Sequence, residues 1–501
     1  MKDKSNLRNY IDKRPLFLDK EWHLIDLNVK YAWKQNITGK GINVCVIDTG
    51  IYENPDLFIE KSENNPIINN IEVIIKGLDY THGTAIAGII GAKGNKYCIG
   101  IAPKCILHSY NHLGLYSESN NTKLSKFIMN NKNKIDIYNN SWGPIDETEP
   151  NTQDSKQILE VIKQSCKKGR NKKGNIFVFA AGNNNLSGGL ATYNDYANSR
   201  FTITVGAINE DLNSSTYSDI GSSILCVAPG GRDVHRINKT ERTRVFAGPD
   251  TMGITTTLPY NDKIKGLIPY THVMNGTSAA TPMVTGCIAL MLNVRPDLTW
   301  RDVKEIISRS CYQNYFHNDT VINQNIIING DNRIISQEMG FGIIHIKRMI
   351  RNAKNWKLLP KEKKIKNKIS NLNVVLNKNN KKYETQIVID KNITIETVQL
   401  YVSMNINKPE YQNISNIQIS IVSPHGTNII IANQQTAYVD KTGNVTQYYN
   451  KYPILCEYYR GEKSKGTWKF IFEWFDNPDN ENDDKSVAIL NKLKLDVRGH
   501  K

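Results

Sequence analysis

The chain has 501 residues, of which 39% are hydrophobic and 22% charged, a balance typical of folded globular proteins and not of disordered ones. No stretch approaches the roughly 18 consecutive apolar residues that span a bilayer, and residues 1–17 lack the apolar core of a secretory signal. The sequence therefore predicts no transmembrane segment and no export by the usual signal, which leaves a cytoplasmic location as the default.

The formal net charge of +16 permits binding to acidic partners. Lysine is nevertheless scattered through every region together with asparagine and isoleucine, which indicates a general compositional bias, so no nucleic-acid partner is predicted. The eight cysteines form no CxxC pair, and most stand inside apolar strings. They are interpreted as buried, reduced thiols and not as a disulfide framework or a metal site.

From about residue 22 to 356, short strand-like segments alternate with longer helical ones. The strand-like segments are 41–50, 134–143, 175–183 and 201–208, and the helical ones include 84–92, 155–169 and 281–294. This alternation predicts an α/β domain with a doubly wound, mostly parallel sheet. Reactive groups in such folds gather at the carboxyl ends of the strands, where the sequence places Asp48, Ser141 and Asn183.

After about residue 360 the pattern changes to alternation in steps of two. Segments 381–390, 398–406, 417–433, 467–475 and 493–499 read as strands separated by turn residues, which predicts an all-β sandwich. His425 stands in a Pro-x-Gly turn between two of them and is interpreted as a turn residue. The predicted organisation is an N-terminal arm (1–21), an α/β domain (22–356), a basic linker (357–369) and a β sandwich (370–501).

Four short motifs carry candidate catalytic residues. Asp48 stands in VIDTG, His82 in HGTAIAG, Asn183 in AAGN and Ser278 in NGTSAATP. Taken alone, each allows a structural interpretation; Ser278 would cap a helix that has Pro282 near its first turn. Together they present Asp, His and Ser in one of the known orders of a catalytic triad. They predict Ser278 as nucleophile, His82 as its base, Asp48 as the residue that orients the base, and Asn183 as a donor to the oxyanion.

These motifs, with VAPG (227–230), resemble the catalytic domain of the subtilisin superfamily over residues 22–356. LNVKYAW (27–33), NSWGP (140–144) and DLTWRDV (297–303) are similar to its kexin/furin-like branch. VSPHGT (422–427) and KGTWKF (465–470) are similar to the P domain that follows the protease in that branch. The resemblance implies a serine endopeptidase, of proprotein-processing type, that hydrolyses polypeptides.

The resemblance also implies a preference for a basic residue before the scissile bond. It assigns Ser141, Trp142 and Gly143 to pairing with an extended substrate, Asp146 to the pocket for the residue before the cut, and Asp79 to the next residue upstream. The chain departs from the branch in the pocket string YNDYANS. Asn194 stands where the branch has Asp, and Asp195 would compensate after a shift of one residue. A strict requirement for two basic residues is therefore not expected.

Structural calcium is a further implication, with Asp56 and Asn95 at one site and Asp146 and Asp219 at a second. Some 20 residues precede the recognisable domain, too few for a folding-assisting propeptide. The chain then folds unaided, uses a separate chaperone or propeptide, or continues upstream. Two other functions stay open: a broad-specificity degradative protease, and a catalytically silent peptide-binding module.

Overall fold

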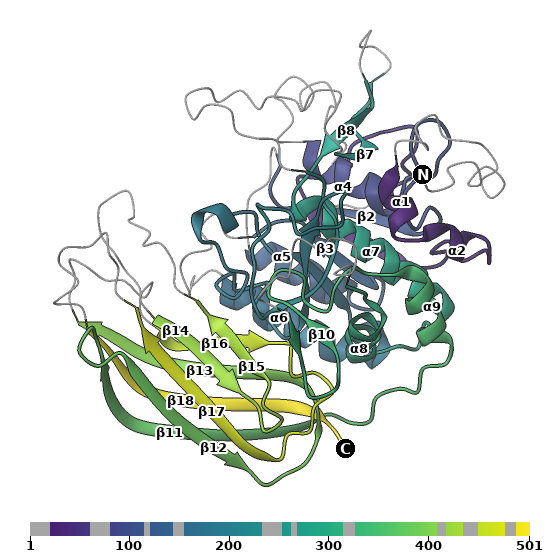
Figure 1. Ribbon diagram of the computed structural model, residues 1–501. Coiled ribbons are helices and arrows are strands. Elements are labelled where there is room, and N and C mark those ends of the chain that lie inside the picture. Colours follow the sequence, from purple (N-terminus) through teal and green to yellow (C-terminus); the bar gives the residue numbers. More distant parts are fainter. Residues whose placement is uncertain are drawn as a thin grey trace, which may run out of the picture.

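The computed structural model describes residues 21–60, 81–114, 121–143, 155–232, 253–261, 268–313, 326–407, 417–433, 449–475 and 487–501. Figure 1 shows an α/β part, in purple to green, beside a β sandwich in green to yellow. The predicted fold class, a doubly wound parallel sheet followed by an all-β sandwich, is confirmed.

A parallel sheet forms the centre of the α/β part. Its strands run in the order β2-β1-β3-β4-β5-β6. Their bounds are Asn43–Asp48 (β1), Ile106–Asn111 (β2), Ile137–Asn140 (β3), Ile176–Ala180 (β4), Thr202–Ile208 (β5) and Ile224–Pro229 (β6). Nearly every residue of these strands is buried, as expected of a parallel sheet that is covered on both faces.

Helices cover both faces of this sheet. They are Trp22–Asp26 (α1), Val29–Trp33 (α2), His82–Gly91 (α4), Asn121–Asn131 (α5), Ser155–Lys172 (α6), Thr277–Val294 (α7), Trp300–Ser310 (α8) and Ile346–Lys354 (α9). Val44 and Val46 of β1 belong to the apolar cluster of α4 and α7, whereas the alternate residues Cys45 and Ile47 belong to that of α5 and α6. The two clusters therefore lie on opposite faces.

Helix α7 is an exception to the expectation that no segment is apolar enough to cross a membrane. Among the described residues it is the one helix that meets such a test by length and composition, and 83% of it is buried inside the fold. It is the central helix of the apolar core in this structure. All eight cysteines lie in the described ranges, where each is buried and free of disulfides.

Short elements complete the α/β part: a 3-10 helix at Asn185–Ser187, a pair of strands at Ile254–Thr257 (β7) and Tyr270–Met274 (β8), and another at Ile327–Ile328 (β9) and Ile334–Ile335 (β10). The 3-10 helix follows β4 in the sequence and begins shortly after Asn183. This places an irregular segment next to the candidate site.

Two antiparallel four-stranded sheets make up the β sandwich, in the orders β11-β18-β13-β16 and β12-β17-β14-β15. Their bounds are Lys363–Leu376 (β11), Lys382–Ile389 (β12), Thr394–Asn407 (β13), Ile417–Val422 (β14), Asn428–Ala432 (β15), Tyr449–Cys456 (β16), Gly466–Trp474 (β17) and Val487–His500 (β18). Strand β11 includes the second half of the segment predicted as a linker, because Ile365 is buried while the alternate lysines point to solvent. His425 lies in the turn between β14 and β15, as predicted.

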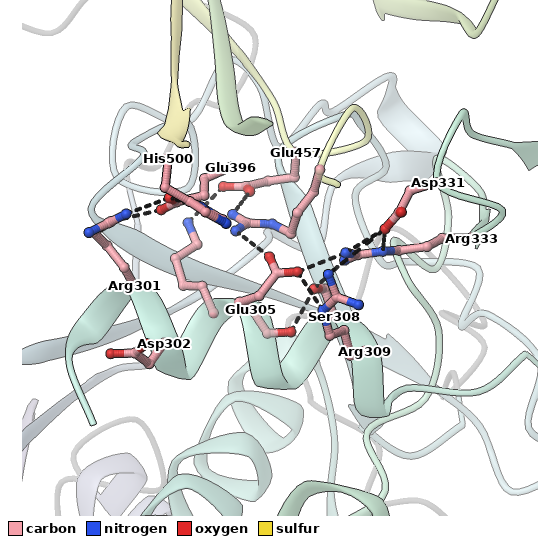
Figure 2. A network of polar contacts seen from close by, with 12 residues as sticks. Arg301, Asp302, Glu305, Ser308, Arg309, Asp331, Arg333, Glu396, Glu457 and His500 are labelled. Atoms are coloured by element: carbon pink, nitrogen blue, oxygen red, sulfur yellow. Dashed lines mark hydrogen bonds and ion pairs between the residues drawn. The ribbon is translucent and has the colours of Figure 1, made fainter. Parts of the chain in front are cut away.

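Buried ion pairs join α8 to the β sandwich (Figure 2). Lys304 donates to Glu457 at 2.7 Å, and Arg460 lies 3.2 Å from Glu305. All four side chains are at most 4% exposed. Since a buried charge without its partner costs about 3–5 kcal/mol, these pairs tie the two parts of the chain together.

Candidate active site

Asp48 and His82 meet where the end of β1 faces the start of α4. His82 Nδ1 lies 2.8 Å from Asp48 Oδ1, and the carboxylate is fully buried. The same oxygen accepts the Thr49 backbone N–H at 2.7 Å, while the Thr49 hydroxyl accepts the Gly83 N–H at 2.9 Å. A Cβ on Gly83 would lie 2.3 Å from a backbone oxygen of Gly50, so only glycine lets the two segments approach this closely.

Ser278 is the second residue of α7, so it does not occupy the N-cap, which was the structural alternative to its predicted role as nucleophile. Gly276, with φ +99°, occupies the N-cap and has no side chain of its own to cap the helix. Pro282 lies inside the helix and not in its first turn. Because proline has no N–H, the Ser278 carbonyl lacks its usual partner four residues on; it accepts the Ser141 hydroxyl at 3.0 Å instead. The Ser278 hydroxyl donates to the Ser141 carbonyl at 3.1 Å.

Asn183 follows β4 and faces Ser278 across a small cavity. Its side-chain oxygen accepts the backbone N–H and the hydroxyl of Thr277, both at 2.9 Å. This fixes the amide so that its NH₂ group is the end that can donate to a ligand. The cavity of about 210 Å³ is lined by Ser141, Trp142, Gly143, Ala180, Gly182, Asn183, Asn184, Asn194, Thr277 and Ser278.

The predicted pocket residues separate into three groups. Ser141, Trp142, Gly143 and Asn194 line the cavity, as their predicted role requires. Asp195 is not among the residues that line the cavity, and its carboxylate accepts the Ser155 hydroxyl of α6. Asp79 and Asp146 lie outside the described residues.

The predicted metal ligands have different surroundings. The Asp56 carboxylate is buried and accepts three backbone N–H groups, from residues 96–98, at 2.7 to 3.1 Å, whereas Asn95 is exposed on the same loop. Asp219 is buried and accepts the Asn184 N–H at 2.6 Å. Among the described residues no group of three or more His, Cys, Asp or Glu side chains is placed to hold a metal ion.

Two residues near these sites were not predicted. Glu21 is buried, with one carboxylate oxygen accepting the Ile99 N–H at 2.9 Å and the other without a hydrogen-bond partner among the described residues. His112 follows β2; its backbone N–H donates to the Asp48 carbonyl at 2.8 Å and its ring centroid lies 5.3 Å from that of Trp142. Burial lowers the pKa of His112, although Asp48 opposes this. Its place at the carboxyl end of a parallel strand was the available sequence signal.

Asp48 and Asn183 thus lie at or shortly after the ends of β1 and β4, and His82 and Ser278 lie at the starts of α4 and α7. Comparison with known proteins identifies the family. Residues 39–342 match the subtilase family and residues 395–496 match the proprotein convertase P-domain. The chain belongs to the subtilase family, and its relatives include kexin- and furin-like proteases, which confirms the resemblance predicted from the motifs.

Among these relatives are endoprotease bli-4 of Caenorhabditis elegans (26% identity over 92% of this chain and 47% of that protein) and kexin of Candida albicans (27%, 90% and 47%). The chain thus spans about half the length of both. The Aeromonas extracellular serine protease of Aeromonas sobria is 26% identical over 93% of this chain and 82% of that protein.

Solved structures share the fold along the whole chain. The serine protease of Aeromonas sobria superimposes with a TM-score of 0.80 at 22% identity and covers 99% of this chain and 98% of its own. The same protease in complex with a chaperone gives a TM-score of 0.78 at 21% identity, with 99% and 97% covered. At this identity the likeness concerns the fold alone.

Proposed function

We propose that this chain is a serine endopeptidase in which Ser278 attacks the peptide carbonyl. His82 takes the hydroxyl proton and returns it to the leaving amine, while Asp48 keeps the imidazole in the required tautomer and stabilises its cation. The observation that carries the proposal is the 2.8 Å contact between the buried Asp48 carboxylate and His82 Nδ1, which leaves Nε2 as the nitrogen that accepts a proton. On substrate binding, the Ser278 hydroxyl turns from the Ser141 carbonyl toward that nitrogen.

The oxyanion of the tetrahedral intermediate binds between Asn183 and the start of α7. The first N–H groups of a helix have no intrahelical partner, and the helix dipole favours negative charge there. Since Thr277 holds the Asn183 oxygen, the NH₂ group is orientated before the substrate arrives and needs no rearrangement in the transition state. The extended substrate lies along the backbone of residues 141–143.

The residue before the scissile bond enters the 210 Å³ cavity. A preference for a basic residue rests on three points: Asp146, which lies outside the described residues; the buried Asp219, which accepts the N–H of the cavity residue Asn184; and the similarity to kexin. A broad-specificity protease is the second candidate, because the described residues that line the cavity include no carboxylate. The two candidates differ in whether the cavity prefers a positively charged substrate side chain.

Hydrolysis of fluorogenic peptides with Arg, Lys-Arg, Leu or Phe before the cut tests both. Cleavage by the wild-type protein that is lost in Ser278→Ala establishes the protease. A strong preference for Arg supports the basic pocket, and similar rates for Arg and Leu support the broad-specificity enzyme. Folded wild-type protein that cleaves none of the peptides contradicts the proposal.

Calcium binding at the loop of residues 92–99 is part of the proposal. Burial, and to a smaller extent the charge of Asp56, hold the pKa of Glu21 well above its usual range, against the Ile99 N–H, which lowers it. Two buried carboxylates lie close together, and one has an oxygen without a hydrogen-bond partner among the described residues, so a hard divalent cation would stabilise the pair. Glu21 and Asp56 would hold the ion together with loop oxygens, and the ion's contribution is structural.

The last part of the proposed function is a separate folding partner. The Aeromonas sobria protease, which shares the fold over 99% of this chain, has been solved in complex with a chaperone. We infer that this chain also folds with the help of another polypeptide. Refolding of the denatured chain alone and with that chaperone tests this: equal yields of active protein contradict it.

A further inference from the structure

The segment of residues 192–198 forms one wall of the candidate specificity cavity. Asn194 lines the cavity, and its side-chain oxygen accepts the N–H groups of Tyr196 and Ala197 at 3.0 and 3.2 Å. The Tyr196 ring stacks on Phe179 at 5.2 Å and meets the edge of Trp142 at 5.1 Å. Because Trp142 also lines the cavity, a shift of this segment changes the cavity on two sides.

This segment consists of turns, with no strand or helix, so it lacks the regular backbone hydrogen bonds that stabilise those elements. Its conformation therefore depends on individual hydrogen bonds. Inside it, the Asn198 N–H donates to the Asn194 carbonyl at 2.7 Å, and the Thr202 and Thr204 hydroxyls of β5 donate to the Tyr196 and Ala197 carbonyls, both at 2.6 Å. These bonds lie at the Asn198 end of the segment, so loss of a contact at the Thr192 end should displace that end more than the rest.

Strand β16 of the β sandwich supplies contacts at both ends. The Tyr452 hydroxyl donates to the Thr192 carbonyl at 2.8 Å, and the Leu455 N–H donates to the Asn198 side-chain oxygen at 2.8 Å. The Asn198 amide in turn donates to the Pro453 carbonyl. Residues 192 and 198 are thus tied to one strand of the other domain, and Asn194 lies between them.

Tyr452 is well suited to hold this wall at a fixed distance. It is 2% exposed, and its ring centroid lies 6.3 Å from that of Tyr193. Burial raises the pKa of Tyr452 well above its usual range, so the hydroxyl keeps its proton and remains a donor. The ion pairs of α8 hold the domains together elsewhere in the interface, so gross docking does not depend on this one hydroxyl.

We propose that Tyr452 of the β sandwich is a positioning residue for the specificity cavity, so that the second domain takes part in selecting the residue before the scissile bond. The proposal rests on the proposed protease function. In this proposal, the contacts of β16 with residues 192–198 set the width of the cavity.

The test replaces Tyr452 by Phe, which removes the hydroxyl and keeps the ring. Tyr459→Phe is the matched control, since its hydroxyl donates at 2.6 Å to the Ile421 carbonyl inside the β sandwich and makes no hydrogen bond to residues 192–198 within the described part of the chain. For each variant kcat and KM are measured on peptides with Arg or Leu before the cut, and active sites are counted with a fluorophosphonate that reacts with the nucleophilic serine.

We expect Tyr452→Phe to change the Arg-to-Leu ratio of kcat/KM by about three-fold or more, chiefly through KM, because a small misplacement of a pocket wall changes side-chain fit. Tyr459→Phe should keep the wild-type ratio even if it lowers the melting temperature equally. An unchanged ratio in active, labelled Tyr452→Phe overturns the inference, as does an equal change in the control.

Asn198→Ser offers a second route should Tyr452→Phe fail to fold, since it releases the other end of the segment; a wild-type ratio in this variant also overturns the inference. Folded wild-type protein that is neither labelled nor active refutes the proposed function, and the inference with it. The two failures are therefore distinguishable.

Discussion

Ser141 and Ser278 are joined by a reciprocal pair of hydrogen bonds. The hydroxyl of each donates to the backbone carbonyl of the other, at 3.0 and 3.1 Å. The arrangement exists because Pro282 offers no N–H to the Ser278 carbonyl. The strand end that would bind substrate and the helix start that carries the nucleophile are thereby linked directly.

We expect Ser141→Ala to lower the free energy of unfolding by about 1–3 kcal/mol, because it leaves the Ser278 carbonyl without a donor. Pro282→Ala restores a helical N–H four residues after Ser278 and should offset much of this loss. Urea denaturation of both single variants and the double variant gives the coupling, expected at about 1 kcal/mol. Strictly additive changes would show that the two donors do not serve the same carbonyl.

Asn183→Ala should lower kcat by about 100- to 1,000-fold with little change in KM, the range known for the oxyanion asparagine of subtilisin. Asn183→Asp keeps an acceptor for Thr277 but loses the NH₂ donor, so it should lose comparable activity. Asn185→Ala, two residues on and outside the cavity, serves as control. Full activity of Asn183→Asp would show that only the bond to Thr277 matters.

Asn194→Asp should raise kcat/KM for peptides with Arg before the cut by about ten-fold, equivalent to about 1.4 kcal/mol, and lower it for Leu. One aspartate oxygen can still accept the N–H groups of Tyr196 and Ala197, which preserves the turn, while the other brings a charge to the cavity. The panel of fluorogenic peptides measures both. A parallel change for Arg and Leu would mean that the residue acts on the fold and not on the charge of the cavity.

Removal of calcium should lower the melting temperature by several degrees if the ion binds at Glu21 and Asp56, since a ligand at 100 times its Kd stabilises by about 2.7 kcal/mol. Glu21→Gln should reduce this difference between calcium and chelator. Differential scanning calorimetry of both proteins checks the expectation. Equal melting temperatures of the wild-type protein with calcium and with chelator would exclude a stabilising ion.

Acid should weaken the interface around Glu305. Burial opposes ionisation of this carboxyl, but Arg333, Arg460 and Arg309 outweigh it and lower the pKa of Glu305 to about 2. A carboxyl with a lowered pKa stabilises the folded state above its unfolded pKa, about 4.5, and this contribution is lost as the pH falls toward 2. The loss is on the order of 3 kcal/mol.

Glu305→Gln should therefore be less stable at neutral pH and show a flatter decline of the free energy of unfolding between pH 4.5 and 2. Glu384→Gln, at an exposed carboxylate of β12, is the matched control and should keep the wild-type slope. Chemical denaturation across this pH range measures the slopes. Equal slopes in the wild-type protein and Glu305→Gln would show that Glu305 does not cause the loss of stability in acid.

The sequence by itself determined the fold class and the four motifs of the candidate site. Buried parallel strands need continuous apolar runs, and sandwich strands need alternation, so local pattern reports these elements directly. Asp48, His82, Asn183 and Ser278 were recognisable because short motifs place each at or shortly after the end of a strand, or at the start of a helix. Their order along the chain then indicated their chemistry.

Only the tertiary structure decided which side chains face the cavity and which face elsewhere. Asp195 follows Asn194 directly but contacts α6, because neighbouring residues of a turn point in different directions. Glu21 near Asp56, Ser141 against Ser278, and Tyr452 of the β sandwich against Thr192 are pairings between residues 35 to 260 positions apart. Such contacts depend on how the sheets and helices pack, and this packing cannot be predicted from local sequence periodicity.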